Sequence, residues 1–350
     1  MMMVDDEEPA PTIVASAVSS RPDWSFVQSA ACDHRPPSMG GNLLGEGGGS
    51  VGVYKLVSPV THDAYGVKVV RRDQPADAMR NFVREVEIFN KLRHPGICRL
   101  CTMVADTRFF LLVIELCEAG DLFGVVVKSQ TGLAEEDARS YFVQIISAVD
   151  YCHSHGVYHR DMKLENVLIT EGGRTTKITD FGFAKDTGLH SMPKTRDIGT
   201  RAYMPPEMLD TQADGTSYDG AAVDIWSLGV MLYVMVAVRY PFGDNKSREL
   251  IENIRNVRYS FPERSEGAIC NRHLRELLAA MLVADPRDRI TIADIRRMQW
   301  LAEGGGLDGG MELDELPTLV LDPSLLPPLL VEPQASNDSE FDYDEGHEQF

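Results

Sequence analysis

The sequence predicts an α+β protein of two lobes, a small strand-rich N-terminal lobe with one helix and a larger helical C-terminal lobe. Short alternating runs at Val51 to Leu56 and Tyr65 to Val70 are typical of strands. After Gly120, helical patterns dominate, as in Glu135 to His153 and Ala222 to Val238. The 350 residues exceed the roughly 250–300 at which one hydrophobic core stops growing, so we expect two lobes with a cleft between them.

The N-terminal lobe begins with a glycine-rich loop at Gly45 to Gly52, followed by the two short strands. The next segment, Asp77 to Leu92, is expected to be a helix because its apolar residues recur every three or four positions. These apolar residues are Met79, Phe82, Val83, Val86 and Phe89. Phe109 to Cys117 is almost continuously apolar, which suits a fully buried strand.

Composition separates a central body from two polar ends. Residues 1–38 mix Pro, Ser and acidic residues without periodicity, so we expect them to be disordered. Residues 303–350 form an acidic tail without Lys or Arg, for which we also expect disorder. Between them we place a folded domain at 39–302, with lobes at about 39–116 and 117–302.

The distribution of charge and apolar residues argues against some partners. Most of the net charge of −19 lies in the two ends, so we expect no basic face and no nucleic-acid partner. The longest apolar run, Gly229 to Val238, is shorter than the ~18 residues of a membrane span, so we expect a core helix and no membrane partner. The first residues lack the features of a secretory signal, and we expect a cytoplasmic and/or nuclear protein.

The six cysteines show no disulfide framework. Cys98 and Cys101 have the C-x-x-C spacing of redox and zinc sites, but no second pair of ligands accompanies them. Buried, unreactive thiols are therefore the default interpretation.

A short stretch from Tyr158 to Ile169 (YHRDMKLENVLI) gathers several polar residues, and Asp180 opens a DFG tripeptide soon after it. Asp161 could orient an attacking hydroxyl and accept its proton, while Lys163 could neutralise charge on a transferred phosphoryl group. Asn166 and Asp180 offer the oxygen ligands that Mg²⁺ prefers. The set is suited to phosphoryl transfer from a metal-bound nucleotide, and a charged surface loop is the alternative.

Lys68 falls in the second apolar strand, where an unpaired charge would be costly. Glu85 is the natural partner, because it borders the apolar stripe of the expected helix, close to Phe82 and Phe89. An ordinary solvated carboxylate is the alternative. We expect an ion pair between Lys68 and Glu85.

These motifs resemble the protein kinases, whose pattern is H-R-D-L-K-x-x-N followed by D-F-G; here Met162 replaces the usual Leu. The resemblance spans about residues 42–301 and implies a bilobal kinase that uses ATP and Mg²⁺. It assigns catalysis to Asp161, Lys163, Asn166, Lys68 and Glu85, and metal binding to Asn166 and Asp180. It also makes Ile114 the gatekeeper, beside a hinge at Glu115 to Cys117.

The resemblance further implies a set of ATP-binding residues: Leu44, Gly45, Gly47, Gly52, Val53, Lys68, Glu115, Cys117 and Leu168. The glycine-rich loop departs from the kinase form G-x-G-x-x-G-x-V, because Val53 comes one residue late if Gly45 and Gly47 are the first two glycines. The register of this loop is left open. Outside the cleft, Glu207 is expected to pair with Arg289, and Asp224 to cap the backbone of the catalytic loop.

Several phrases are similar to the plant stress kinases related to the sucrose-non-fermenting kinase, within the calcium/calmodulin-kinase-like group. Leu164 in HRDMKLEN and the Val283 to Pro286 stretch are examples. The branch implies stress or nutrient signalling, an upstream kinase, and a regulatory phosphatase on an acidic tail; a solvated tail without a partner is the alternative. Arg160 is expected to await a phosphate on Thr195, or secondly on Ser191.

The resemblance also predicts the protein substrates. Thr200 is expected to lie near Asp161 and Lys163 and to favour Ser or Thr as the target. Asp121 and Glu165 lie where kinases that select basic peptides hold upstream Arg or Lys residues. Two alternatives to an active serine/threonine kinase are a pseudokinase scaffold with the same fold and an interaction protein that acts through its tail.

Overall fold

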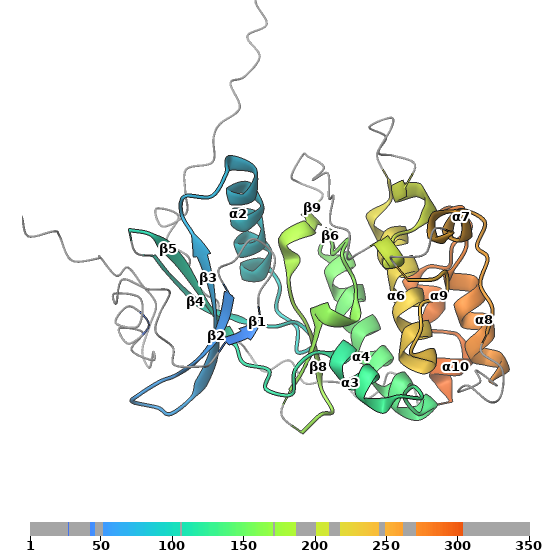
Figure 1. Ribbon diagram of the computed structural model, residues 1–350, viewed down its shortest axis with the longest axis horizontal. Helices are drawn as coiled ribbons and strands as arrows, with labels where there is room; N and C mark the ends of the chain where they lie inside the picture. The colour runs from blue at the N-terminus through green and yellow to red at the C-terminus, as the bar shows by residue number, and fades with distance from the viewer. Residues whose placement is uncertain are drawn as a thin grey trace, which may run out of the picture.

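The computed structural model has two lobes side by side, a sheet with one helix and a larger set of helices (Figure 1). It describes Val27 and residues 43–45, 52–105, 107–170, 172–186, 201–209, 218–244, 249–261 and 271–303. The predicted α+β fold with a strand-rich first lobe and a helical second lobe is confirmed.

The N-terminal lobe is built on a five-stranded antiparallel sheet with the order β1-β2-β3-β5-β4. The strands are β1 (Leu43–Gly45), β2 (Gly52–Val57), β3 (Ala64–Arg71), β4 (Leu100–Ala105) and β5 (Phe109–Glu115). In this register Val53 of β2 lies opposite Lys68 of β3, and Lys68 lies opposite Leu112 of β5. Lys68 is therefore in the middle of the sheet, flanked on both sides.

The two faces of β3 pack against different partners, because successive side chains of a strand point to opposite faces. Val67 and Val69 join an outer cluster that also contains Val27. Val70 belongs to the main core on the inner face. The inner face is covered by α2 (Ala76–Lys91), which stands between the sheet and the second lobe (Figure 1).

The buried residues of α2 are Phe82, Val83, Glu85, Val86, Ile88 and Phe89. Their spacing is the one expected from the sequence, so the apolar stripe turns toward the sheet and carries one carboxylate with it. Pro75 precedes the first helical residue, where its extended backbone starts the helix.

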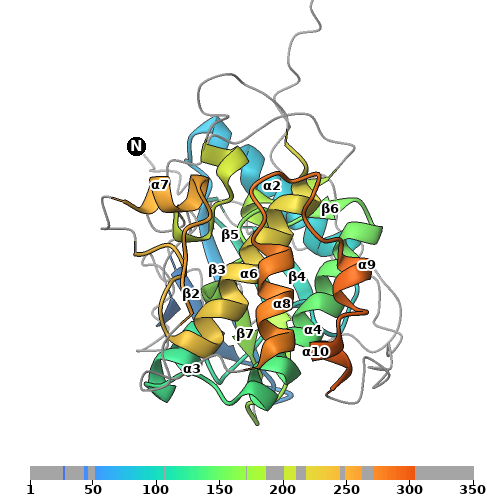
Figure 2. The same ribbon diagram turned by 90° about the vertical axis from the view of Figure 1, so that its right-hand side faces the viewer.

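The C-terminal lobe consists mainly of helices. They are α3 (Leu122–Ser129), α4 (Glu135–Ser154), α6 (Gly220–Ala237), α7 (Leu250–Arg255), α8 (Arg272–Met281), α9 (Ile292–Ile295) and α10 (Gln299–Ala302). At its centre α6 packs against α4 and α8 (Figure 2). By length and composition α6 could cross a membrane, but 89% of it is buried inside the protein, as expected for a core helix.

Short strands line the junction between the lobes. They form two antiparallel pairs, β6 (Val157–Tyr158) with β9 (Lys185–Asp186), and β7 (Val167–Ile169) with β8 (Thr176–Ile178). The loop between β6 and β7 contains the catalytic motif expected from the sequence, and the DFG tripeptide follows β8.

Deeper in the C-terminal lobe, the guanidinium of Arg289 bonds Glu207 through two nitrogens, at 2.8 and 3.1 Å. Arg289 also donates to the carbonyls of Ala222 and Val283. The expected ion pair is therefore formed, and it fastens the segment 201–209 to the helical lobe.

Candidate active site

A buried carboxylate fixes the backbone of the catalytic loop. Asp224, in the second turn of α6, is fully buried and accepts bonds from the amides of His159 at 2.9 Å and Arg160 at 2.6 Å. His153 of α4 adds a ring nitrogen at 2.8 Å. Arg160 has a φ of +65°, which is unfavourable for a residue with a side chain, and these bonds hold it there.

Close packing brings α6 near enough for this contact. Gly220 is the first residue of the helix, and a Cβ at this position would lie only 2.7 Å from Cβ and Cγ of Tyr158 in β6. Only glycine allows the helix to approach β6 this closely. Asp224 follows about one turn later on the same helix.

Three side chains meet in the part of the catalytic loop that follows His159 and Arg160. Lys163 Nζ lies 2.9 Å from Asp161 Oδ2. Asn166 Nδ2 donates to the main-chain oxygen of Asp161 at 2.8 Å and to its carboxylate at 3.2 Å. Burial alone would lower the pKa of Lys163, but the Asp161 carboxylate raises it above its ordinary value, so Lys163 is positively charged.

The sheet and the C-terminal lobe contribute a second charged cluster. Lys68 Nζ lies 2.6 Å from Glu85 Oε1, so the expected ion pair is formed, and 3.6 Å from Asp180 Oδ1. Burial alone would lower the pKa of Lys68, but Glu85 and Asp180 raise it. One ammonium therefore connects β3, α2 and the DFG segment.

Asp180 and Asn166 have the donor chemistry of a magnesium site. Burial alone would raise the pKa of Asp180, yet the nearby Lys68, His159 and Lys163 bring it below its ordinary value, so it is ionised. Because Asn166 uses its amide nitrogen on Asp161, its oxygen is the atom available to a cation. A carboxylate and an amide oxygen fit Mg²⁺, whose remaining ligands are commonly waters and phosphate oxygens.

Aromatic rings connect these clusters. The Phe181 ring lies 5.3 Å from that of Phe89 in α2, edge on, and 4.9 Å from that of His159. His159 is bound to Asp224 through its amide. Ring contacts thus run from α2 through the DFG segment to His159, whose backbone amide continues the connection to α6, and they link the position of α2 to that of the catalytic loop.

Glu115, the expected hinge residue, is tied to both lobes. Its Oε1 lies 2.7 Å from Lys177 Nζ of β8, and its Oε2 accepts from the amide of Arg99 at 3.3 Å. Ile114, the expected gatekeeper, faces Gly66 of β3, where an added Cβ would lie 3.0 Å from the Ile114 Cγ1. The Ile114 side chain therefore takes up the space next to Gly66 that an alanine methyl would need.

The other described residues expected to bind ATP belong to β1, β2, β7 and the segment just after β5. Gly45 of β1 lies opposite Val53 of β2, with an irregularity in the ladder between Leu43 and Gly45. Leu44 is half exposed, Gly52 is buried, and Leu168 of β7 is partly buried. Cys117 is partly buried just beyond β5.

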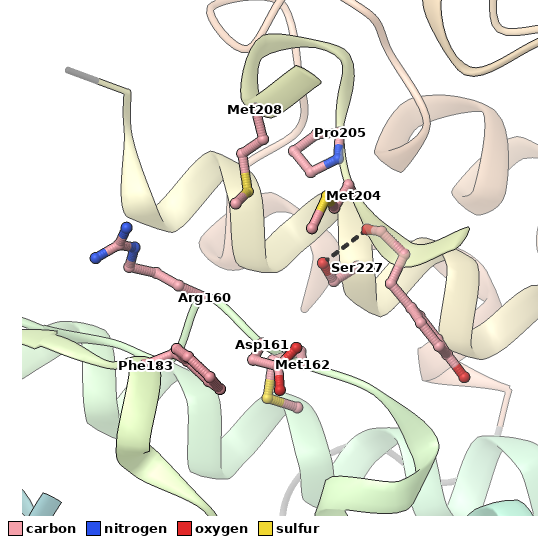
Figure 3. A pocket seen from close by; sticks show the side chains of 9 residues that line it. Arg160, Asp161, Met162, Phe183, Met204, Pro205, Met208 and Ser227 are labelled. Atoms are coloured by element: carbon pink, nitrogen blue, oxygen red, sulfur yellow. Dashed lines mark hydrogen bonds between the residues drawn. The ribbon is translucent and has the colours of Figure 1, made fainter. Parts of the chain in front are cut away.

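A pocket opens between the catalytic loop and the segment that precedes α6 (Figure 3). Asp161, Met162 and Phe183 lie on one side of it, and Met204 and Pro205 on the other. Ser227 lies between them and donates to the carbonyl of Tyr203 at 3.1 Å. The proposed proton acceptor is thus at the edge of a mainly apolar hollow.

Arg160 also lines this pocket, and its guanidinium stacks over the Tyr218 ring at 5.0 Å and donates to the Tyr218 hydroxyl. Burial lowers the pKa of Arg84 in α2, and the positive charge of Arg160 lowers it further. Two cations from different lobes therefore lie near one another.

Asp121 and Glu165 lie at the other end of the catalytic loop. Asp121 caps α3, its Oδ1 accepting from the amide of Gly124 at 2.7 Å. Burial raises the pKa of Glu165, and the negative charges of Asp121 and Asp161 raise it further. Among the described residues, no group bonds to the buried Oε2 of Glu165.

Four expected site residues lie outside the residues that the structure describes: Gly47, Ser191, Thr195 and Thr200. Sequence reasoning also missed several residues of the site. The sequence gives no role to His153, Arg84, Lys177 or Tyr218. No local sequence pattern marks these residues, because each interacts with a partner more than fifty residues away along the chain.

Comparisons with known proteins agree with this geometry. The family model described as a protein kinase domain matches residues 40–301. Serine/threonine-protein kinase SAPK2 of Oryza sativa subsp. indica is 40% identical over 260 residues, 73% of this chain and 74% of the relative. Serine/threonine-protein kinase SRK2C of Arabidopsis thaliana is 39% identical over 261 residues, 73% of each chain. For SRK2D of the same plant the identity is 38% over 264 residues, 73% of this chain and 69% of the relative.

The chain belongs to the protein kinase family, as a serine/threonine kinase. The resemblance to the plant stress kinase branch is confirmed as well.

The anchoring by Asp224 can be tested by mutation. Asp224→Ala removes the acceptor of two buried amides, so we expect the free energy of unfolding to fall by about 2–4 kcal/mol. We also expect the kinase rate to fall by about 10²-fold, because the catalytic loop loses its position. Urea unfolding and initial rates on a peptide measure the two effects.

Asp219→Ala is the matched control on the same helix. Asp219 is exposed and caps α6 through the amide of Ala221 at 2.9 Å, so its loss should cost about 1 kcal/mol without changing the rate. Equal effects of the two variants on the rate would contradict a specific role for Asp224.

Proposed function

We propose that this kinase transfers the γ-phosphoryl group of magnesium ATP to a serine or threonine hydroxyl of a protein. The proposal rests on two charged clusters. In one, Lys163 pairs with Asp161; in the other, Lys68 contacts Glu85 and Asp180. Each cluster combines a cation with a carboxylate, as phosphoryl transfer requires.

In this proposal each residue has a defined task. Asp161 orients the substrate hydroxyl and accepts its proton, with Asn166 fixing the carboxylate. Lys163 and Lys68 neutralise charge on the phosphates, and their positions are fixed before the substrate arrives. Bound Mg²⁺ would neutralise further phosphate charge, held by Asp180 and Asn166.

The nucleotide would lie between β2 and β7. Backbone groups at Glu115 and Cys117 would bind adenine, and Leu44, Val53 and Leu168 would enclose it. The glycines Gly45, Gly47 and Gly52 would let backbone amides approach the phosphates. The ion pair of Glu115 with Lys177 supports this assignment, because it holds this residue in place through its side chain.

Removal of the proton acceptor or of the strand lysine should abolish activity. We expect Asp161→Asn to lower kcat by about 10²–10⁴-fold, because proton transfer loses its base. Lys68→Met should also be nearly inactive, because the phosphates lose a fixed cation. The measurement is transfer of labelled phosphate from magnesium ATP to a generic basic peptide, with circular dichroism to confirm folding.

Lys128→Met, at an exposed position of α3, is the control and should leave the rate unchanged. An Asp161→Asn enzyme with the wild-type rate would contradict the assigned base. A wild-type protein that binds nucleotide but transfers no phosphate would favour the pseudokinase alternative.

We infer that the substrates carry Arg or Lys upstream of the target hydroxyl. The support is the pair of carboxyl groups of Asp121 and Glu165 at one end of the catalytic loop, close enough that the charge of Asp121 contributes to raising the pKa of Glu165, with the Glu165 Oε2 buried and not bonded by any described group. A buried carboxylate oxygen is stabilised when a cationic donor reaches it.

Glu165→Gln should therefore lower kcat/KM at least about tenfold for a peptide with an upstream Arg, the effect of one hydrogen bond to a charged group. A peptide with Ala at that position should be unaffected, and Glu136→Gln, at an exposed position of α4, should change neither rate. A peptide array with an acidic or proline-directed preference would refute the inference.

We further propose activation by phosphorylation of Thr195, with Ser191 second, by an upstream kinase during stress or nutrient signalling. Arg160 and Arg84 support this, since two neighbouring cations from different lobes would both be stabilised by a phosphate. Thr200 would then contact the substrate side of Asp161 and Lys163.

We expect Thr195→Ala to have low activity that phosphatase treatment does not change, whereas phosphatase should inactivate the wild type. Phosphopeptide mapping of the protein from stressed and unstressed cells locates the site, with Ser191→Ala as the comparison. Full activity of Thr195→Ala with an unchanged phosphopeptide map would rule out this site.

A further inference from the structure

Two thiols meet at the hinge. Cys98, just before β4, is 1% exposed, and its Sγ donates to the carbonyl of Glu115 at 3.5 Å. Its side chain also forms a hydrogen bond with that of Cys117, which is partly exposed. The two cysteines are nineteen residues apart in the sequence, and the backbone brings their segments side by side, since the amide of Glu115 donates to the carbonyl of Arg99 at 2.9 Å.

The C-x-x-C spacing pointed to a different pair. Cys101 lies at the irregularity of β4 between Leu100 and Thr102 and packs against the outer cluster that contains Val27. Cys98 belongs to the main core on the other side of the sheet. The thiol next to Cys98 is therefore that of Cys117.

The backbone keeps the two thiols together. The amide of Cys98 donates to the carbonyl of Ile178 at 2.9 Å, and the amide of Ile178 donates to Gly96 at 2.8 Å. Glu115, two residues before Cys117, is held by Lys177 of the same strand β8. Both cysteines are thus positioned by one short strand of the C-terminal lobe.

Their environments give the two thiols different reactivity. The hydrogen bond with Cys98 lowers the pKa of Cys117, with a smaller contribution from the charge of Lys177. The same contact and burial raise the pKa of Cys98 well above its ordinary value. Cys117 is therefore the more accessible and more readily ionised thiol, as expected of an initial nucleophile.

We propose that Cys117 is an oxidation site for hydrogen peroxide and that Cys98 converts the oxidised form into a disulfide across the hinge. The Cys117 thiolate attacks one peroxide oxygen and becomes a sulfenic acid, while the O–O bond breaks and the other oxygen leaves as water after protonation. Cys98 sulfur then displaces the sulfenic hydroxyl, which takes the Cys98 proton and leaves as water. Two thiols and one peroxide thus give one disulfide and two waters.

The disulfide would weaken nucleotide binding. It removes the thiol that donates to the Glu115 carbonyl and shifts Cys117, and the backbone of both residues is proposed to bind adenine. We expect the KM for ATP to rise about threefold to tenfold, the effect of one lost hydrogen bond. Only this functional part of the inference rests on the proposed ATP chemistry.

Peptide mapping tests the link itself. The full-length protein is treated with hydrogen peroxide, blocked with N-ethylmaleimide and digested with trypsin without reduction. Cleavage after Arg99 separates the two cysteines of the C-x-x-C segment, so the expected product joins His94–Arg99 to Phe109–Lys128. Cys98→Ala, Cys98→Ser and Cys117→Ser should lose this product, and Cys101→Ser should keep it.

The kinetic arm compares each protein before oxidation, after oxidation and after reduction with dithiothreitol. The wild type and Cys101→Ser should show the reversible rise in KM, and Cys98→Ala should not. A link that involves Leu100–Arg108, or oxidised Cys117 without any link, would overturn the inference. A linked protein with unchanged KM would overturn its regulatory part, whereas inactivity of the reduced wild type would instead count against the proposed function.

Discussion

The active site depends on a carboxylate that never reaches solvent. Asp224 accepts two amide bonds from the catalytic loop and one contact from His153, and it is fully buried. A buried charge is tolerated only when donors surround it, so the loop and the helix must fold together. The strained backbone of Arg160 and the position of Asp161 both follow from this arrangement.

Packing of aromatic side chains connects the catalytic loop held by Asp224 to the N-terminal lobe. His159, Phe181 and Phe89 make the ring contacts that end on α2, the helix that carries Glu85. Glu85 in turn fixes Lys68 in the middle of the sheet. Asp161 and Lys68 are therefore positioned by one chain of contacts, and displacement of α2 would separate Glu85 from Lys68.

The sequence predicted those parts of the fold and site that depend on local order. The apolar stripe of α2 predicted that Glu85 borders the buried side of the helix. The YHRDMKLENVLI motif predicted that Asp161, Lys163 and Asn166 lie in one loop. It did not reveal β4, because the irregularity between Leu100 and Thr102 breaks the alternation that marks a strand. Nor did it connect Arg84 with Arg160, since the two come from different lobes.

By itself, the sequence determined the two-lobe class, the reaction type and the residues of the catalytic loop, because periodicity and motif spacing are local properties of a chain. Only the tertiary structure decided which distant groups meet. It brings the ring of His153 to Asp224. It also makes Cys117, and not the Cys101 of the C-x-x-C spacing, the cysteine that interacts with Cys98. Such contacts arise when strands and helices pack, and their residue spacing is set by loop lengths that carry no chemical signal.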